Sequence, residues 1–156
     1  MAKITPFLWF DKEAEQAMNF YVSLFPNSKV RNVVRYGDMG PTAGVIVCDF
    51  TIFGLDITAM NAGPTFKLNE AFSLVVDCED QKEVDHYWSK LTADGGEESM
   101  CGWLKDKFGV SWQIVPKRLT ELTADPTTAK AQRVLDAMLQ MRKLDVAKLE
   151  AAAAAG

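Results

Sequence analysis

Two stretches decide the fold of this chain: C-D-F-T-I-F-G-L-D-I-T at Cys48–Thr58, and C-G-W-L-K-D-K-F-G-V-S-W at Cys101–Trp112. Each joins two short runs of aromatic and β-branched residues through a Phe-Gly dipeptide, a pattern that is typical of a β-hairpin. The turns are expected near Gly54 and Gly109. Because the two hairpins share their order of residue types, the sequence predicts a fold built from two copies of one module.

A helix with one apolar face precedes each hairpin. The first helix is expected to begin with Asp11 as its N-cap and to end at Pro26. The second opens with the capping-box pattern Asp80–Glu83 and ends at Gly95. At a constant offset of 67 positions, the apolar residues Ala17, Tyr21 and Leu24 correspond to Val84, Trp88 and Leu91. The helices therefore support the duplication that the hairpins indicate.

The remaining strands complete a β-α-β-β-β order. In the first half we expect strands at Ile4–Phe10, Lys29–Tyr36, Val45–Phe50 and Leu55–Met60. In the shorter second half we expect them at Ala71–Val76, Cys101–Lys105 and Val110–Val115. We therefore predict an α+β fold of duplicated βαβββ modules with a C-terminal helical extension. The chain is expected to form one domain over 1–156, with module one at 3–62, module two at 66–117 and C-terminal helices at 119–150.

The C-terminal region is expected to be helical from Leu119 onward. Asp125-Pro126 predicts an N-cap with proline at the first helical position, and Leu144–Leu149 predicts a shorter helix with frayed residues from Ala151. The first of these helices carries an apolar stripe, formed by Val134, Leu135, Met138 and Met141. Two interpretations stay open, because this stripe can pack on its own domain or pair with a second subunit.

The composition is that of a globular protein. The chain has 156 residues, 48% of them hydrophobic and 24% charged, and its net charge of -4 argues against nucleic acid and anionic membranes as partners. No run approaches the roughly 20 apolar residues of a membrane span, and the N-terminus lacks the apolar core of a signal peptide. Three cysteines without a CxxC pair predict reduced thiols and a cytoplasmic protein.

Longer motifs resemble those of a known family. They are W-F-D-x-x-A-E-x-A-x-x-F-Y-x-x-x-F-P-N-S at Trp9–Ser28, M-N-A-G-P at Met60–Pro64, F-K-L-N-E-A-F-S at Phe66–Ser73, C-E-D-Q-x-E-V-D-x-Y-W at Cys78–Trp88, C-G-W-L-K-D-K-F-G-V-S-W-Q-I-V-P at Cys101–Pro116 and R-V-L-D-A-M-L-Q-M at Arg133–Met141. With these motifs the chain resembles PhnB-like proteins, also described as 3-demethylubiquinone-9 3-methyltransferase-like. The resemblance implies the vicinal oxygen chelate fold of glyoxalase I and the bleomycin resistance proteins. In that fold two βαβββ modules form a cupped sheet around a small-molecule pocket, usually in a homodimer.

The resemblance also implies where a metal would bind. Metal-using members of the superfamily place four His or Glu side chains in the cup, one from the first and one from the last strand of each module. The corresponding positions here hold Thr5 or Pro6, then Asp56, Thr58 or Met60, then Glu70 or Ala71, and Gln113. None is an imidazole, and the single histidine, His86, lies off the apolar face of its helix and is expected at the surface.

We therefore predict no metal and no other cofactor. The alternative is one hard divalent cation held by Asp56, Glu70 and Gln113 with water. No glycine-rich phosphate loop follows a strand, because the Gly37–Gly40 pattern is too short. This argues against a nucleotide or S-adenosylmethionine, and so against the methyltransferase activity in the family name.

Candidate ligand-binding residues come from the strands and turns that would surround the cup. They are the aromatic residues Trp9 and Trp103, the thiol of Cys101, and the polar residues Asn61, Asn69, Ser73 and Gln113. If Gln113 faces the cavity, the alternation of side chains along its strand makes Trp112 a core residue. Asn61, which precedes Ala62-Gly63-Pro64, is favoured as a turn residue. No residue is assigned a catalytic role.

The leading interpretation is a metal-free, homodimeric protein that binds a small apolar or aromatic organic ligand in the cup. A second interpretation is an enzyme, either a metal-assisted isomerase or lyase or the methyltransferase of the family name. A third is an interaction module that works through its C-terminal helix. Fold alone does not separate these interpretations, since this fold hosts several chemistries.

Overall fold

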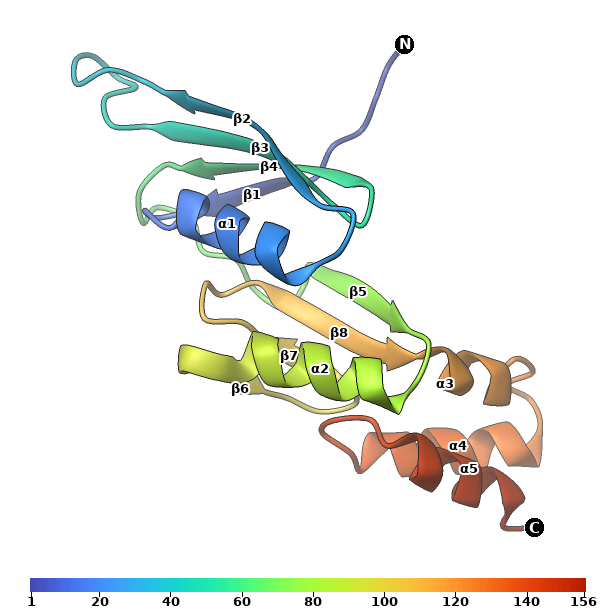
Figure 1. Ribbon diagram of the computed structural model, residues 1–156. Coiled ribbons are helices and arrows are strands. Elements are labelled where there is room, and N and C mark those ends of the chain that lie inside the picture. The colour runs from blue at the N-terminus through green and yellow to red at the C-terminus, as the bar shows by residue number, and fades with distance from the viewer. The chain divides into compact units, whose positions relative to one another are not determined.

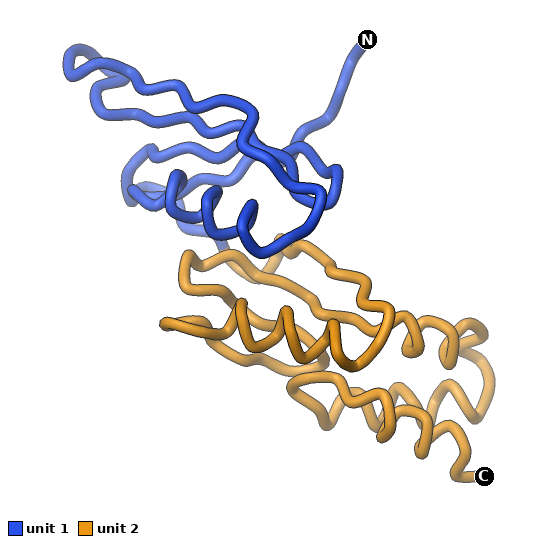
Figure 2. The backbone as a smooth tube through the Cα atoms, in the orientation of Figure 1, with its two compact units in different colours: residues 1–68 blue, residues 69–156 orange.

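The computed structural model describes residues 1–156, which form two compact units, 1–68 and 69–156 (Figure 2). The first unit contains β1 (Phe7–Phe10), α1 (Ala14–Leu24), β2 (Lys29–Arg35), β3 (Ile46–Ile52) and β4 (Leu55–Asn61) (Figure 1). The strands form one sheet in the order β1-β4-β3-β2, in which β1 is parallel to β4 and the other neighbours are antiparallel.

The second unit repeats this arrangement. It contains β5 (Ser73–Cys78), α2 (Gln81–Thr92), the short 3₁₀ helix η1 (Ala93–Gly95), β6 (Glu97–Glu98), β7 (Trp103–Lys105) and β8 (Ser111–Pro116). Its strand order is β5-β8-β7-β6, with β5 parallel to β8 and the other neighbours antiparallel. The duplicated α+β fold is therefore confirmed, with the short strand β6 as an element that the sequence did not indicate.

In each unit one helix covers one face of the sheet (Figure 1). The buried side of α1 consists of Ala14, Ala17, Met18 and Tyr21, and that of α2 consists of Val84, Tyr87, Trp88 and Leu91. Alternate strand residues such as Phe50 and Trp112 are buried against these helices, while their neighbours in sequence face the other way. Each sheet therefore presents a second face that its own helix does not cover.

Three further helices follow β8: α3 (Lys117–Leu122), α4 (Ala129–Leu139) and α5 (Val146–Ala154). They enclose a small hydrophobic cluster of their own, made of Leu119, Leu122, Val134, Leu144 and Leu149, with Met138 and Met141 packed against it. Three residues of the predicted apolar stripe, Val134, Met138 and Met141, thus pack within their own unit. No helix has both the length and the apolar character needed to cross a membrane.

The first predicted helix start was wrong. α1 begins at Ala14, and Asp11 lies before it, outside the cap position. The backbone N–H of Ala14 instead donates to the amide oxygen of Asn61 at 2.7 Å. The cap thus comes from the end of β4, because β1 and β4 are paired and bring the two residues together.

Two predictions for the C-terminal helices were also wrong. Thr128, and not Asp125, caps α4 by accepting from the N–H of Ala131, whereas the Asp125 carboxylate accepts from Thr127 in the preceding turn. The last residues do not fray, because α5 continues to Ala154. Arg133 holds this end by donating to the carbonyls of Ala152 and Ala153, each at 3.1 Å.

Asp106 organises the turn between β7 and β8. Only 3% of this residue is exposed, and its carboxylate accepts from the N–H groups of Phe108 and Val110 and from the indole N–H of Trp112 at 2.8–3.0 Å. We expect Asp106→Ala to lower the free energy of unfolding by about 2–4 kcal/mol, because buried donors lose their acceptor. Urea denaturation measures this, and Asp38→Ala at an exposed loop position is the control. Equal stability of the two variants would contradict the assigned role.

Candidate functional site

The second unit contains a cavity of about 490 Å³ beside β7 and β8. Its lining combines apolar and charged side chains, namely Glu70, Glu97, Glu98, Ser99, Met100, Cys101, Trp103, Leu104, Lys105 and Ser111. A cavity of this size can take a small organic molecule.

The floor of this cavity carries a buried hydroxyl without a partner. Ser111 is 2% exposed, and its Oγ makes no hydrogen bond. It lies at the start of β8, in register with Ser73 on β5 and Lys105 on β7. Buried polar groups in native proteins are almost always paired, so this hydroxyl is an unused hydrogen-bonding group next to the cavity.

An ion pair stands beside this hydroxyl. The Nζ of Lys105 lies 2.5 Å from the Oε1 of Glu70. The hydrogen bond from Lys105 lowers the pKa of Glu70, and the same bond raises the pKa of Lys105. Both groups are therefore charged at neutral pH.

A tight turn, Met100–Trp103, forms one edge of the cavity. The N–H of Trp103 donates to the carbonyl of Met100 at 3.0 Å, and the central residues have φ values of 58° at Cys101 and 84° at Gly102. Positive φ at both central residues is typical of a type I′ turn, which suits a short hairpin such as β6–β7. The turn presents the half-buried thiol of Cys101 to the cavity.

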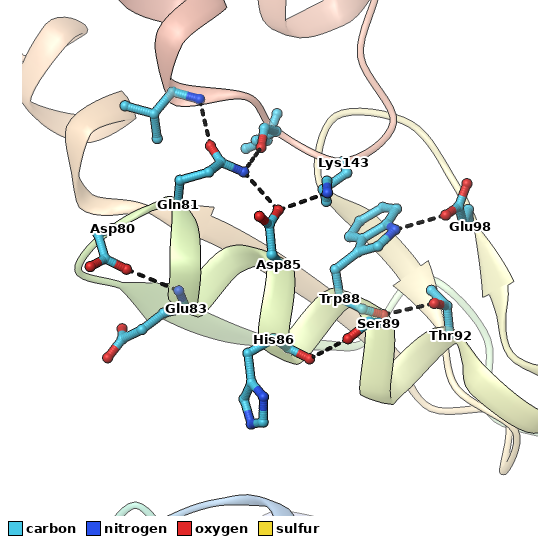
Figure 3. Close-up of polar contacts among 12 residues, drawn as sticks. Asp80, Gln81, Glu83, Asp85, His86, Trp88, Ser89, Thr92, Glu98 and Lys143 are labelled. Atoms are coloured by element: carbon cyan, nitrogen blue, oxygen red, sulfur yellow. Dashed lines mark hydrogen bonds and ion pairs between the residues drawn. The ribbon is translucent and has the colours of Figure 1, made fainter.

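The charge of the lining is negative. The lining residues carry three carboxylates, those of Glu70, Glu97 and Glu98, and one ammonium group, that of Lys105. Glu98 also accepts a hydrogen bond from the indole of Trp88 on α2 at 2.8 Å, which orients its carboxylate (Figure 3). The field of such a lining favours neutral or cationic molecules over anions.

The first unit contains a separate cavity of about 630 Å³. It lies between the loop at 41–45 and the ends of β1, β3 and β4, and its lining includes Trp9, Tyr36, Val47, Met60 and Asn61. The polar groups at its base are already used, since the indole of Trp9 donates to the carbonyl of Gly63 at 2.9 Å and Asn61 caps α1. This cavity therefore has room for a small molecule, but no buried polar side chain without a partner lines it.

The candidate ligand-binding residues fall at several places. Trp9 and Asn61 line the cavity of the first unit, and Cys101 and Trp103 line that of the second. Ser73 and Gln113 are neighbours on β5 and β8, where the Gln113 amide donates to the Ser73 hydroxyl at 2.9 Å. Asn69 is exposed and accepts from the N–H of Ala71 in its own turn.

Sequence reasoning missed most of the lining of the second cavity, namely Glu97, Glu98, Ser99, Met100, Leu104, Lys105 and Ser111. A signal for Ser111 was present, because alternation along its strand sets it on the face opposite the core residue Trp112, which is 1% exposed. Lys105 lies on the adjacent strand in register with Ser111, but strand pairing is set by the tertiary fold.

The residues considered as metal ligands are engaged elsewhere. Asp56 forms ion pairs with Lys3 and, at 3.0 Å, with Arg31, and Glu70 is paired with Lys105. The structure has no group of three or more His, Cys, Asp or Glu side chains placed to hold a metal ion. Asp56, Glu70 and Gln113 therefore do not form the cluster of ligands that a metal centre needs. His86 is exposed on α2, as predicted.

The comparisons with known proteins agree on one family. The family model described as 3-demethylubiquinone-9 3-methyltransferase matches residues 2–115. The solved structure of the PhnB protein from Bacillus cereus, described as a putative 3-demethylubiquinone-9 3-methyltransferase, is similar at 38% sequence identity and a TM-score of 0.67, over 74% of this chain and 99% of that chain. No curated protein matches the sequence.

More distant structures share the fold alone. A protein from Pseudomonas aeruginosa is similar at 17% identity and a TM-score of 0.63, over 74% of this chain and 98% of that chain. A variant of the fosfomycin resistance protein FosX from Listeria monocytogenes, solved with Mn(II) and dihydroxypropylphosphonic acid, is similar at 17% identity and a TM-score of 0.56, over 74% of this chain and 92% of that chain. The α3–α5 region lies beyond the residues that the family model matches.

The pKa of the Asp56 carboxyl group tests the hydrogen bond that it accepts from Thr51 in the first unit. Hydrogen bonds from Lys3 and from the Thr51 hydroxyl, with Arg31 nearby, lower its pKa from 3.8 to about 2. Because the folded pKa lies below the unfolded one, the stabilising effect is complete above pH 3.8 and is lost as the pH falls through about 2. We expect Thr51→Val to raise this pKa toward 3.8, measured by side-chain carboxyl NMR.

Thr58→Val is the matched control for this titration. Its hydroxyl donates to a different carboxylate, that of Asp49, at 2.6 Å. The pKa of Asp56 should therefore be unchanged in this variant. A shift of the same size in both variants would show that the Thr51 hydrogen bond does not set the pKa.

Proposed function

The chain belongs to the PhnB-like, or 3-demethylubiquinone-9 3-methyltransferase, family of the vicinal oxygen chelate superfamily, and from that premise we propose that it binds a small organic ligand. The binding site is the cavity of its second unit. The observation that carries the proposal is the buried, unpaired hydroxyl of Ser111 on the floor of that cavity. A ligand that pairs with this hydroxyl removes the cost of leaving it unsatisfied.

The lining specifies the chemistry of the ligand. Trp103 and Met100 offer an apolar and aromatic wall, which suits a planar hydrocarbon body. Ser111 takes one polar substituent of the ligand, either a donor or an acceptor. Glu70 is paired with Lys105, and Glu98 lies 3.9 Å from Arg142, so Glu97 supplies the remaining negative charge of the lining. This charge favours a neutral or cationic molecule, and the ligand class is therefore an aromatic alcohol or amine.

The ligand binds without a metal, because the carboxylates that would hold one, Asp56 and Glu70, already pair with Lys3, Arg31 and Lys105. We further propose a homodimer, which the family resemblance implies, and a cytoplasmic location, since all three cysteines are free thiols.

A series of naphthalene compounds of similar size tests the ligand class. We expect 1-naphthylmethylammonium and 1-naphthalenemethanol to bind the purified protein about tenfold more tightly than 1-naphthylacetate at low salt, a difference of about 1.4 kcal/mol. Isothermal titration calorimetry at neutral pH measures the three affinities. Raising the salt concentration should reduce the preference for the cation, because the carboxylates lie near solvent.

Two serine variants locate the binding site. Ser111→Ala should weaken the binding of 1-naphthalenemethanol about fivefold to tenfold, since one hydrogen bond to the alcohol is lost. Ser89→Ala is the control, because that hydroxyl lies exposed on α2 and bonds only to the carbonyl of His86. Equal affinities of the two variants, or tighter binding of the naphthylacetate anion, would refute the proposed site.

A native mass spectrum of protein purified without chelator tests the metal and the dimer together. We expect twice the chain mass, without a bound divalent ion. A stoichiometric divalent ion would overturn the metal-free proposal and favour the alternative of a metal-assisted isomerase or lyase. A monomer at micromolar concentration would refute the homodimer.

A further inference from the structure

The segment that follows the family-matched region returns to the cavity. Between α4 and α5 lies a short connector, Met141–Asp145, which belongs to neither helix. The carbonyls of Met141 and Arg142 accept hydrogen bonds from the N–H groups of Cys101 and Gly102, each at 2.8 Å. The connector thus holds both central residues of the type I′ turn that borders the cavity.

Close packing adds to these hydrogen bonds. A Cβ placed on Gly102 would lie 2.9 Å from the carbonyl oxygen of Ile114 and 3.0 Å from the side chain of Leu144. Gly102 is therefore required here both for its positive φ and for the close approach of the connector. The guanidinium of Arg142 also lies 3.9 Å from the carboxylate of Glu98, another residue of the cavity lining.

Gln81 fastens the connector from its other side. It is the first residue of α2, and its side-chain oxygen accepts from the N–H of Val146 at 2.8 Å. Its amide nitrogen donates to the carbonyl of Leu144 at 3.1 Å and to the carboxylate of Asp85 at 3.0 Å. Asp85 in turn forms an ion pair with Lys143 at 2.7 Å, so that α2 contacts Lys143 and Leu144 of the connector and Val146 at the start of α5 (Figure 3).

The backbone conformation of Cys101 makes the turn at Met100–Trp103 depend on the hydrogen bonds from the connector. Positive φ is unfavourable for a residue with a Cβ, and type I′ turns prefer Asn or Gly at the position that Cys101 occupies. External hydrogen bonds to its two N–H groups offset this preference. In the first module, the residue that corresponds to Gln81 is Ala14, 67 positions earlier. Its side chain has no amide to hold another segment, and its backbone N–H donates to Asn61 of β4.

We propose that Gln81 is a positioning residue for the cavity of the second unit. It fixes the connector to α2, and the connector fixes the turn that presents Met100 and Cys101 to the ligand. The C-terminal helices, which lie beyond the region shared with the family model, thus serve as a clamp on the binding site. The clamp adds to the proposed function, but its geometry does not depend on which ligand binds.

The thiol of Cys101 reports on the clamp without a ligand. Cys48 and Cys78 are fully buried, and burial raises the pKa of both, that of Cys78 to about 12, so a disulfide reagent labels Cys101 first. We expect Gln81→Ala to speed this labelling about tenfold and to speed amide hydrogen exchange at residues 101–102, as loss of hydrogen bonds of ordinary strength predicts. Gln132→Ala is the matched control, because the side chain of this exposed glutamine donates to the carbonyl of Pro126, in the turn before α4.

A second variant keeps the test decisive if Gln81→Ala unfolds. Lys143→Ala removes only the ion pair with Asp85 and should give a smaller increase in both rates. Folded Gln81 and Lys143 variants with the labelling and exchange rates of Gln132→Ala would overturn the clamp. If the clamp opens as expected but no naphthalene compound binds the unaltered protein, the clamp stands and the proposed ligand site fails. If the compounds bind and the rates do not change, only the clamp fails.

Discussion

Each four-stranded sheet has one helix, which covers one of its two faces, so the polar side chains on the other face pair with one another or with neighbouring segments. In the first unit Thr51 donates to Asp56 and Thr58 donates to Asp49. In the second unit Gln113 donates to Ser73, and Lys105 pairs with Glu70. Ser111 holds the place on β8 that Asp56 holds on β4, and its hydroxyl has no partner. The candidate site is the point at which this pairing is incomplete.

The difference between the two units follows from their hairpin turns. The β3–β4 turn is a two-residue turn in which Phe53 and Gly54 have φ values of 48° and 80°, so the residues beside it, Ile52 and Leu55, pair directly. The β7–β8 turn is longer and is built around Asp106, whose carboxylate is used by the turn itself and by Trp112. That carboxylate is therefore unavailable to Ser111, and the place opposite Ser111 is taken by Lys105.

Much of the fold was predictable from local pattern, and the site only in part. The Phe-Gly turns, the two apolar helix faces and the core position of Trp112 follow from spacing along the chain. Trp103 and Cys101 line the cavity of the second unit, whereas Asn61 caps a helix that starts 47 residues earlier and Asn69 stabilises its own turn. Caps supplied by a distant strand have no signature within a short window of sequence.

The sequence by itself determined the duplicated βαβββ modules, the family, and the apolar faces that bury the helices, because these depend on periodicity and on motifs that neighbouring residues form. Only the tertiary structure decided which polar groups are satisfied. Strand register sets Lys105 opposite Ser111, and chain reversal after α4 brings Met141 and Arg142 to the turn at Cys101. Hydrogen bonds act over about 3 Å, so the pairing of residues forty or sixty positions apart is known only once the chain has folded.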